Sequence, residues 1–440
     1  MNLLLNVNLV FITRVAVYLL AFALNIVLAR ALGPEGRGLY ALFLLVAAVT
    51  AAGASLGIGL GNIYYLGKGK YSRGVLLGNS HFLVLMVAAL TVAVVVALGL
   101  AFEPRAFVAG RPYWLYAPAV PLVLHFIIMT TYLQGENRFM AMNAVIAFQS
   151  ALLTVAAVTL FYVGHLSLFT VLLALMASFA AADLLALAMV RAWALGASLR
   201  PRWQALRDQL SYGAKGQAAN LAQLFNYRLD VLLVAAFASS ADVGYYAVAV
   251  GLSETIWWVA NSVSAVLMPR LTRLEGRDAA YLTALACRNT LLLSAVAAVA
   301  LALVAPPAVT ALFGGEFRPV VTPIYWLLPG IVALSGGKVI TAYIFSQGRV
   351  ILNTYNTIIA LALTLILDAV LIPRFGVTGA AIAASAAYIL SLGISLFWYR
   401  RVFGQKVGEL LLPKGRDLQL YLGAVRRLGA RYVPMGRTGA

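Results

Sequence analysis

Eight ionisable side chains lie deep inside long apolar runs of this sequence. They are Arg14, His125, Asp183, Arg228, Asp230, Glu254, Lys338 and Asp368. An ionisable group in the middle of an apolar helix costs at least about 2.5–3.5 kcal/mol to insert, so such residues face a water-filled cavity or a partner. These positions are therefore the first candidates for binding and for ion exchange.

One of these runs carries a polar stripe. Gln223, Asn226 and Asp230 are spaced three and four residues apart, which places them near one face of a helix, and Arg228 lies beside them. We expect the stripe to line a cavity, with Asn226 and Arg228 contacting a substrate; an internal ion pair between helices is the alternative. Arg14 is a further candidate for substrate binding, the alternative being that it reaches headgroups at the end of its helix.

Glu254 precedes two tryptophans and Asn261 in an apolar run that contains no basic residue. A carboxylate in this setting is either paired with an arginine from another helix or protonated part of the time. Glu254 and Asp230 are thus expected to exchange a proton or a sodium ion, and a static buried ion pair is the alternative. Asn261 is expected to bind substrate. No cofactor other than this H⁺ or Na⁺ is expected.

His125 and Lys338 each lie nine residues before a Gln-Gly pair, so the sequence presents them as matching positions. Both apolar runs also carry prolines, which kink helices and free backbone carbonyls. Lys338 is expected to bind substrate. The expected hinge or gate residues are Pro118, Pro121, Pro329 and His125. For His125, a hydrogen-bonded packing role is the alternative.

The composition of the chain defines the elements that must position these residues. Of its 440 residues, 63% are apolar and 10% are charged, against about 25% charged in soluble domains. Long apolar runs recur up to about residue 400, and each can cross a hydrocarbon core of about 30 Å. The chain is therefore predicted to be an all-α, polytopic membrane protein. One cysteine, three histidines and the lack of a GxxxxGK[ST] loop exclude disulfides, a His-rich metal centre and ATP hydrolysis by the chain.

We predict twelve membrane-spanning helices. The predicted spans are 7–32, 38–66, 76–101, 113–134, 139–163, 168–191, 211–238, 242–268, 282–306, 321–346, 350–372 and 377–400. Of the 32 lysines and arginines, 23 lie on the side of the N-terminus, six on the other side and three within spans. Because cytoplasmic loops are enriched in these residues, both termini are predicted to be cytoplasmic. The net charge of +18 is then a topology signal, and no binding of nucleic acid is expected.

The sequence also repeats itself with a period of slightly more than 200 residues. The matching pairs are Gly38-Leu39-Tyr40 with Gly244-Tyr245-Tyr246 at an offset of 206, Gln134-Gly135 with Gln347-Gly348 at 213, and Gly164 with Gly376 at 212. Six spans per repeat is an even number, so both halves enter the membrane in the same direction. We therefore predict two six-helix lobes that are related by a pseudo-two-fold axis along the membrane normal and enclose a cleft, as in transporters.

This architecture gives an N-terminal lobe at 1–200, a C-terminal lobe at 201–402 and a cytoplasmic tail at 403–440. The tail and the stretch 201–210 are amphipathic and basic, which predicts helices lying on the membrane surface. Inside the second span, three glycines at GxxxG spacing predict a close-packing face or a hinge.

Three segments resemble a known family, the bacterial polysaccharide flippases of the Wzx type. They are Leu28 to Leu42 (LARALGPEGRGLYAL), Ser346 to Arg349 (SQGR) and Leu371 to Leu390 (LIPRFGVTGAAIAASAAYIL). They cover a minority of the chain but occur in the right order. The superfamily of these flippases also holds the multidrug and toxic compound extrusion (MATE) exporters and the lipid II flippases, so the resemblance implies a MATE-like fold.

The resemblance further implies a transporter, not an enzyme. A polyprenyl-pyrophosphate-linked oligosaccharide would move from the cytoplasmic to the outer leaflet of the bacterial inner membrane by alternating access. The expected partners are this substrate, membrane lipids, a polysaccharide polymerase and chain-length proteins. Arg14 and Arg228 would take the role of the arginines that such flippases carry in the first span and in the central cavity.

Two other functions remain open from the sequence. An ion-coupled MATE-type multidrug exporter would need a net acidic cleft, whereas the three cations Arg14, Arg228 and Lys338 outnumber the central acids Asp230 and Glu254. A lipid II flippase usually has two additional spans, where this sequence has an amphipathic tail. A glycosyltransferase or polymerase would need large outer loops, and the predicted ones are short.

Overall fold

The computed structural model describes residues 3–101, 113–194, 200–274 and 276–411, and every regular element within them is a helix. The α-helices are α1 (Leu3–Ala54), α2 (Ile58–Lys68), α3 (Arg73–Ala101), α5 (Tyr116–Gly135), α6 (Phe139–Tyr162), α7 (Leu168–Ala194), α8 (Trp203–Phe237), α9 (Ser240–Ser253), α10 (Trp257–Leu271), α11 (Gly276–Phe313), α12 (Val321–Ser346), α13 (Val350–Arg401) and α14 (Gly408–Leu411). The short 3₁₀ helices are η1 (Tyr113–Leu115), η2 (Glu254–Ile256) and η3 (Gly315–Val320).

Two of the helices, α1 and α13, are 52 residues long and bend sharply at a glycine. α1 bends at Gly33 (φ 64°) and α13 at Gly376 (φ 54°), where a positive φ favours a residue without a Cβ. Pro34 follows Gly33, and its missing N–H is tolerated in the first turn of the second arm. Each of these helices therefore contains two arms, and the arms meet where the sequence predicts a connection between spans.

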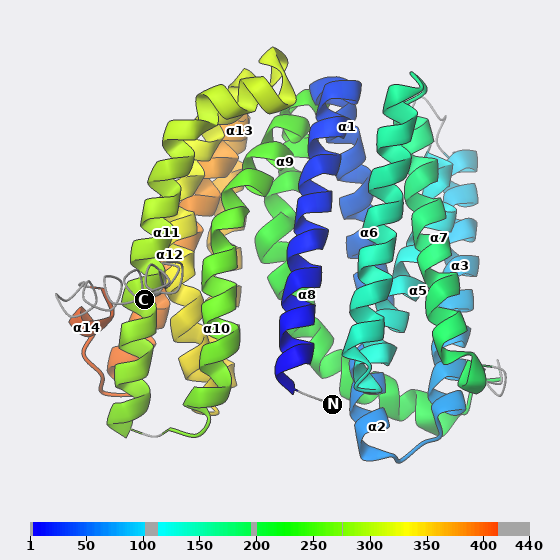
Figure 1. Ribbon diagram of the computed structural model, residues 1–440, viewed down its shortest axis with the longest axis horizontal. Coiled ribbons are helices and arrows are strands. Elements are labelled where there is room, and N and C mark those ends of the chain that lie inside the picture. Colours follow the sequence, from blue (N-terminus) through cyan, green and yellow to red (C-terminus); the bar gives the residue numbers. More distant parts are fainter. Residues whose placement is uncertain (1–2, 102–112, 195–199, 275, 412–440) are drawn as a thin grey trace, which may run out of the picture. The chain divides into compact units, whose positions relative to one another are not determined.

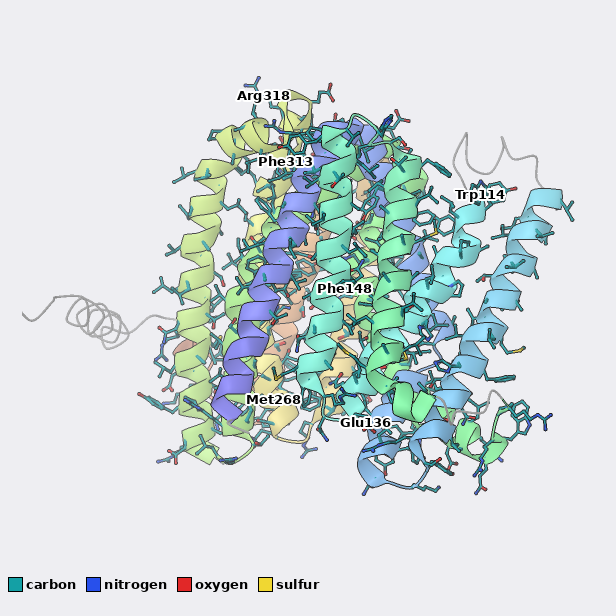
Figure 2. The ribbon with its side chains drawn as sticks, turned by 45° about the vertical axis from the view of Figure 1, so that its right-hand side comes forward. Trp114, Glu136, Phe148, Met268, Phe313 and Arg318 are labelled. Carbon is teal, nitrogen blue, oxygen red and sulfur yellow. The ribbon has the colours of Figure 1, made fainter. Side chains whose placement is uncertain are left out.

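Within the described residues, eight helices are long and apolar enough to cross a membrane. α8 is not among them because it carries the polar stripe of Gln223, Asn226 and Asp230. The segment formed by α9 and α10 is not among them because the 3₁₀ helix η2 divides it into two shorter helices. Large apolar side chains project from the helices, such as Phe148 on α6 and Trp114 on η1 (Figure 2). The prediction of an all-helical membrane fold is confirmed, whereas the twelve-span count and the two six-helix lobes remain predictions.

The chain folds as two compact units. Unit 1 comprises Met1–Val248, Pro307–Val320 and Ile372–Val377, and unit 2 comprises Ala249–Pro306, Val321–Leu371 and Thr378–Ala440. In unit 1, α1, α5, α6 and α7 pack side by side around a core of buried leucine, valine and isoleucine side chains (Figure 1). Contacts group α8 with the N-terminal helices in unit 1. The predicted boundary between the two lobes at residue 200 stays a prediction.

Unit 2 has its own core, formed where α10, α11, α12 and the end of α13 meet. Leu271, Cys287 and Ile340 are fully buried there. Arg288 on α11 donates a hydrogen bond to the backbone oxygen of Glu409, which anchors α14 to this unit. The rest of the predicted amphipathic tail, residues 412–440, lies outside the described residues.

The repeated glycines Gly38 and Gly244 pack against each other inside unit 1. A Cβ on Gly38 would meet the backbone of Ser240 and Gly244, and a Cβ on Gly244 would meet the backbone of Pro34 and Gly38. Ser240 and Gly244 are related to Pro34 and Gly38 by the same offset of 206, so the contact is reciprocal. Reciprocal contacts of this kind arise when two equivalent segments pack about a two-fold axis, which supports the predicted duplication at this offset.

The turns that follow α5 and α12 show a different register from the one predicted. Arg138 N–H donates to Leu133 O at 2.9 Å, and Arg349 N–H donates to Ile344 O at 3.2 Å. The left-handed residues of the two turns are Asn137 (φ 57°) and Gly348 (φ 73°). These turns match at an offset of 211, two residues less than the offset of 213 between the Gln-Gly pairs.

The stretch 201–210, predicted to lie on the membrane surface, forms the first turns of α8, a helix of 35 residues that continues through the predicted seventh span. Its place at the membrane surface stays a prediction. Gly57 and Gly213 meet backbone to backbone, so α2 and α8 approach closely, and one of the predicted GxxxG glycines does line a packing face. Asn62, Asn79 and Gln209 join α2, α3 and α8 through buried hydrogen bonds.

Candidate functional site

In unit 2, Lys338 on α12 lies against α10. Its Nζ donates a hydrogen bond to Asn261 Oδ1 at 3.1 Å and lies 4.6 Å from the centroid of the Trp257 ring. Trp257 is itself fixed, because its indole N–H donates to Ile331 O at 3.2 Å and its ring packs edge-on against Tyr388. An amide oxygen and an aromatic face thus hold the ammonium group in place. The structure brings together two of the predicted substrate-binding residues, Lys338 and Asn261.

Glu254 lies next to this cluster, in the 3₁₀ turn η2 that separates α9 from α10. Its charge interacts with that of Lys338. The sequence suggested an arginine as its partner, and a lysine of α12 takes part of that role. A tightened turn within a long helix is a common place for a functional hinge. Ion coupling by Glu254 stays a prediction.

The polar stripe of α8 lies in unit 1. Asp230 is buried there, and its carboxylate accepts hydrogen bonds from the hydroxyl of Tyr246 on α9 and from the N–H of Val231. Asn226 is also buried, and its Oδ1 has no hydrogen-bond partner among the described residues. Arg228 is partly buried, and its Nη1 donates to the backbone oxygen of Tyr227 at 3.1 Å. The predicted stripe therefore exists, and Asp230 ties α8 to α9.

The remaining predicted site residues are spread over several helices. Arg14 belongs to α1, but its side chain lies outside the described residues. Pro118 lies in the first turn of α5, where a helix needs no N–H donor, so it imposes no kink. Pro121 and Pro329 lie in helices whose backbone stays helical throughout. The N–H of Gly330, next to Pro329, donates to Ser385 Oγ at 2.8 Å, which ties α12 to α13.

His125 has partners that the sequence did not indicate. Its Nδ1 lies 3.1 Å from Asp183 Oδ1 on α7, and its ring stacks on that of His81 on α3. His81 lies 44 residues before His125, so no spacing rule connects the two. Three ionisable side chains thus meet between α3, α5 and α7.

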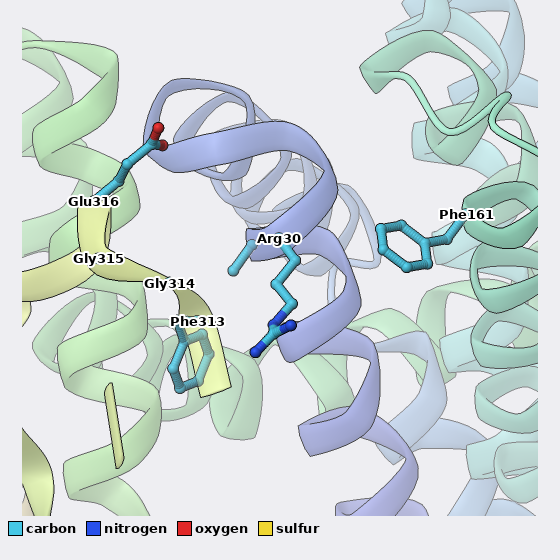
Figure 3. Close-up of a pocket in the computed structure, with 7 residues that line it drawn as sticks. Arg30, Phe161, Phe313, Gly314, Gly315 and Glu316 are labelled. Carbon is cyan, nitrogen blue, oxygen red and sulfur yellow. The ribbon is translucent and has the colours of Figure 1, made fainter. Parts of the chain in front are cut away.

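A cavity of about 470 Å³ lies at one end of unit 1 (Figure 3). Its lining residues are Ala29, Arg30, Phe161, Phe313, Gly314, Gly315 and Glu316. Arg30 Nε donates to Leu312 O at 2.7 Å, and its Nη2 donates to Ala311 O. These carbonyls end α11, where a cation is favourable because of the helix dipole. The cavity therefore combines a held guanidinium with the carboxylate of Glu316.

Arg37 is a second cation that the sequence analysis did not single out. It is 7% exposed, its Nη2 donates to Asn25 Oδ1, and its guanidinium lies 5.7 Å from the Tyr40 ring centroid. Its Nε and Nη1 have no hydrogen-bond partner among the described residues. Arg37 therefore places a buried positive charge in the first hairpin of unit 1.

An ion pair outside the membrane-spanning segments holds the first turns of α8 in place. Lys70 Nζ lies 2.7 Å from Asp208 Oδ2, and Tyr71 donates to the same oxygen at 2.6 Å. The hydrogen bonds from Lys70 and Tyr71 lower the pKa of Asp208, and the hydrogen bond to Asp208 raises the pKa of Lys70. This contact holds the turn before α3 against α8.

The sequence pattern of a family described as "Polysaccharide biosynthesis protein" matches residues 3–275, which is more than half of the chain. The chain belongs to this family. The resemblance seen in the sequence segments is thereby confirmed. No curated protein sequence matches the chain.

Solved structures show the same fold. The lipid II flippase MurJ in an inward closed conformation matches 98% of this chain and 94% of its own, with a TM-score of 0.75 and 13% identity. An inward-facing and an outward-facing structure of a multidrug resistance MATE family transporter match 88% and 91% of this chain and 94% and 95% of their own. Their TM-scores are 0.66 and 0.63, each at 15% identity. This member of the polysaccharide biosynthesis family therefore has a MATE-like fold.

Proposed function

We propose that this family member is a flippase that moves a polyprenyl-pyrophosphate-linked oligosaccharide from the cytoplasmic to the outer leaflet. The observation that carries the proposal is membership of a polysaccharide biosynthesis family by a chain with a transporter fold. A hydrophilic glycan cannot cross hydrocarbon unaided, because its hydroxyl groups would lose their hydrogen bonds to water. A polar passage for the glycan head, with the lipid tail remaining in the bilayer, removes this barrier.

The cations at the site suit the pyrophosphate of such a substrate. Lys338 presents an ammonium group held beside Asn261 and Trp257, and arginine can donate two parallel hydrogen bonds to phosphate. In this proposal Lys338, Arg14 and Arg228 bind the anionic head, while Asn226 and Asn261 bind sugar hydroxyls. Outward movement of an anion is favoured by an inside-negative potential, by about 2.3 kcal/mol per charge per 100 mV.

Alternating access, with Asp230 and Glu254 exchanging an ion, completes the proposed mechanism. What supports this role is that η2, which contains Glu254, packs against α12, the helix that carries Lys338. An arriving anion would compete with Glu254 for Lys338 and favour release of the carboxylate to a proton or Na⁺. The Glu254→Gln variant should then lose its dependence on that ion while still binding substrate.

The proposed location is the inner membrane of a bacterium, with both termini in the cytoplasm, as the distribution of basic residues predicts. Membrane lipids surround the exposed apolar side chains. The proposed protein partners are a polysaccharide polymerase and chain-length proteins, which would use the exported oligosaccharide.

Reconstitution tests the proposal directly. The purified protein is placed in vesicles that contain a fluorescent polyprenyl-pyrophosphate oligosaccharide, and a membrane-impermeant enzyme then modifies the sugar exposed outside. The flippase proposal predicts that nearly all of the labelled lipid becomes accessible, against the outer-leaflet half in protein-free vesicles. Accessibility equal to that of protein-free vesicles would refute it.

Two other substrates belong in the same assay. The likeness to a MATE family transporter makes a drug exporter the second candidate, and the likeness to MurJ makes lipid II the third. Labelled lipid II and an amphiphilic cation therefore replace the oligosaccharide in parallel vesicles. Movement of either one in place of the lipid-linked oligosaccharide would reassign the protein.

A further inference from the structure

Two histidines and an aspartate meet in a cluster inside unit 1 that the proposed function does not use; Asp183 is buried and both histidines are half-buried. They come from three helices: His81 from α3, His125 from α5 and Asp183 from α7. His125 Nδ1 lies 3.1 Å from Asp183 Oδ1. The His81 ring stacks on the His125 ring with centroids 5.4 Å apart and planes inclined by 20°. The three groups are therefore in direct contact.

Little of the His125–Asp183 pair is reached by solvent. The side chains of His125 and Asp183 are 13% and 7% exposed. Neither carboxylate oxygen of Asp183 has a hydrogen-bond partner among the described residues, and nor does His81 Nε2, so the 3.1 Å approach of His125 to Oδ1 is a close ion-pair contact. A buried carboxylate in such surroundings is stable only with a compensating positive charge or with a proton.

His125 is the member that contacts both of the others: Asp183 through its Nδ1 and His81 through its ring. Arg73, at the start of α3, pairs with Glu136 at 2.9 Å, and it lies about 12 Å along the helix from His81. Arg138 donates to the backbone oxygen of Met189 at 2.8 Å.

The other charged residues on the helices packed against α3, α5 and α7 come from α1, from the last turns of α2 and α7, and from α8. These residues are Arg14, Arg30, Glu35 and Arg37 on α1, Lys68 on α2, Arg191 on α7, and Arg207, Asp208, Lys215, Arg228 and Asp230 on α8. Among described side chains, α6 contributes no charge to this side of the unit.

This arrangement can exchange one proton. With a proton shared between His125 and Asp183 and with His81 neutral, an imidazolium balances the carboxylate and the cluster carries no net charge. Loss of that proton to water leaves a neutral imidazole and a net charge of −1. A second proton on the stacked His81 would place two cations face to face, which is unfavourable. The three groups therefore titrate as one coupled site.

We propose that His81, His125 and Asp183 form a proton-binding site that couples proton movement to transport in this protein. The ligand is H⁺ because an imidazole nitrogen and a carboxylate oxygen 3.1 Å apart can share one proton, and because no group of described residues here has the ligands of a metal site. Deprotonation removes the attraction between α5 and α7, which changes how these helices pack. His125 and Asp183 hold the proton, and His81 is a positioning residue that disfavours a second one. The inference rests on the proposed transport function.

The first test measures the site without transport. The protein has three histidines, and the third, His165, lies exposed in the loop before α7. Histidine-selective ¹⁵N labelling therefore gives three sets of signals, and the His165→Gln variant identifies the loop signal. We expect the His81 and His125 signals to change together as the pH is varied, and this joint change to disappear in Asp183→Asn. Signals of His81 and His125 that do not respond to pH would overturn the proposal.

The second test measures coupling. In the vesicle assay, with the membrane potential clamped at zero, exchange of one proton per substrate would shift the leaflet distribution about tenfold per unit of pH difference. We expect the full shift for the wild type and for His165→Gln, and a shift smaller by about this tenfold factor in His125→Gln and in Asp183→Asn, because any exchange by Asp230 and Glu254 is unchanged in these variants. His81→Gln should change the pH range of the shift while keeping its size.

The outcomes separate the inference from the proposed function. If the wild type moves the lipid but its distribution ignores the pH difference, the proton site is refuted and the flippase stands. If no lipid moves in any vesicle, the flippase proposal fails, and the histidine signals still decide whether the site binds a proton. If Asp183→Asn does not fold, His125→Gln supplies the same comparison.

Discussion

His125 on α5 and Lys338 on α12 each lie nine residues before a Gln-Gly pair in the sequence, yet their side chains have different contacts. His125 points into the interior of unit 1, against a carboxylate and a second imidazole. Lys338 lies on α12 against an amide and an indole of α10. The turns that end the two helices match at an offset of 211, which pairs Lys338 with Ile127 rather than with His125.

A difference of two residues turns a side chain by about 200° around a helix. If the two helices correspond through their turns, as the predicted duplication implies, His125 and Lys338 lie on opposite faces. The turns are then alike while the charged positions differ. Unit 1 holds an imidazole against a carboxylate, and unit 2 holds an ammonium group against an amide and an indole.

The largest expected effect is at Lys338. We expect Lys338→Ala to slow movement of the lipid-linked oligosaccharide at least about tenfold, the equivalent of about 1.4 kcal/mol. Lys338→Arg should keep most of the activity, because it keeps the positive charge. The rate is measured in the vesicle assay at equal amounts of folded protein. Full activity in Lys338→Ala would remove the contrast between the two helices.

The glycine contact tests what the two halves still share. Gly38→Ala and Gly244→Ala should each lower stability by about 1–3 kcal/mol, because each new methyl group meets backbone rather than a movable side chain. Thermal unfolding in detergent gives the comparison. The two losses should be similar because the contact is reciprocal, and the double variant should lose less than their sum.

The control for this pair is Gly53→Ala in the same helix, where a Cβ would have no neighbour within 4 Å. It should leave stability unchanged or raise it slightly, since alanine favours a helix. A strong loss from Gly38→Ala alone would contradict the reciprocal packing.

The prolines give a smaller effect. Pro118 and Pro329 match at the offset of 211, but Pro118 lies in a first helical turn and Pro329 lies within α12. Pro118→Ala should be nearly silent. Pro329→Ala restores an N–H within α12 and should change the transport rate about twofold, within the range of a weak hydrogen bond. Equal effects from both would show that position within the helix is unimportant.

The smallest effect is expected at the surface contact before α3. The pKa of Asp208 is lowered. Its contribution to the stability of the fold is therefore fully present at pH values above the ordinary pKa of a carboxyl group, and it is lost as the pH falls through the lowered pKa. The pKa of Lys70 is raised, so its contribution to the stability of the fold is lost only as the pH rises into strong alkali. Lys70→Gln should thus lower the unfolding temperature slightly at neutral pH, and the difference from wild type should shrink in acid. A constant difference at all pH values would point to a non-electrostatic origin.

The sequence predicted the helical membrane fold and the family because these depend on long apolar runs and on local segments such as Leu28 to Leu42. It also predicted the neighbours Lys338 and Asn261 as binding residues, since buried polar groups stand out in apolar surroundings. It did not predict His81 as a partner of His125, or the cavity beside Arg30, because these contacts join distant helices whose rotation no local pattern defines. The sequence also did not indicate the match between the two turns at an offset of 211, because glycine and asparagine can both adopt the left-handed conformation there and the residues differ.

The central claim is that Lys338 contacts the transported head group. A Lys338→Cys variant, made in a Cys287→Ser background, is treated with a membrane-impermeant thiol reagent in reconstituted vesicles. We predict that the cysteine reacts and that the lipid-linked oligosaccharide protects it, whereas an Ile127→Cys variant is not protected. A cysteine at position 338 that reacts at the same rate with and without the substrate would contradict the account.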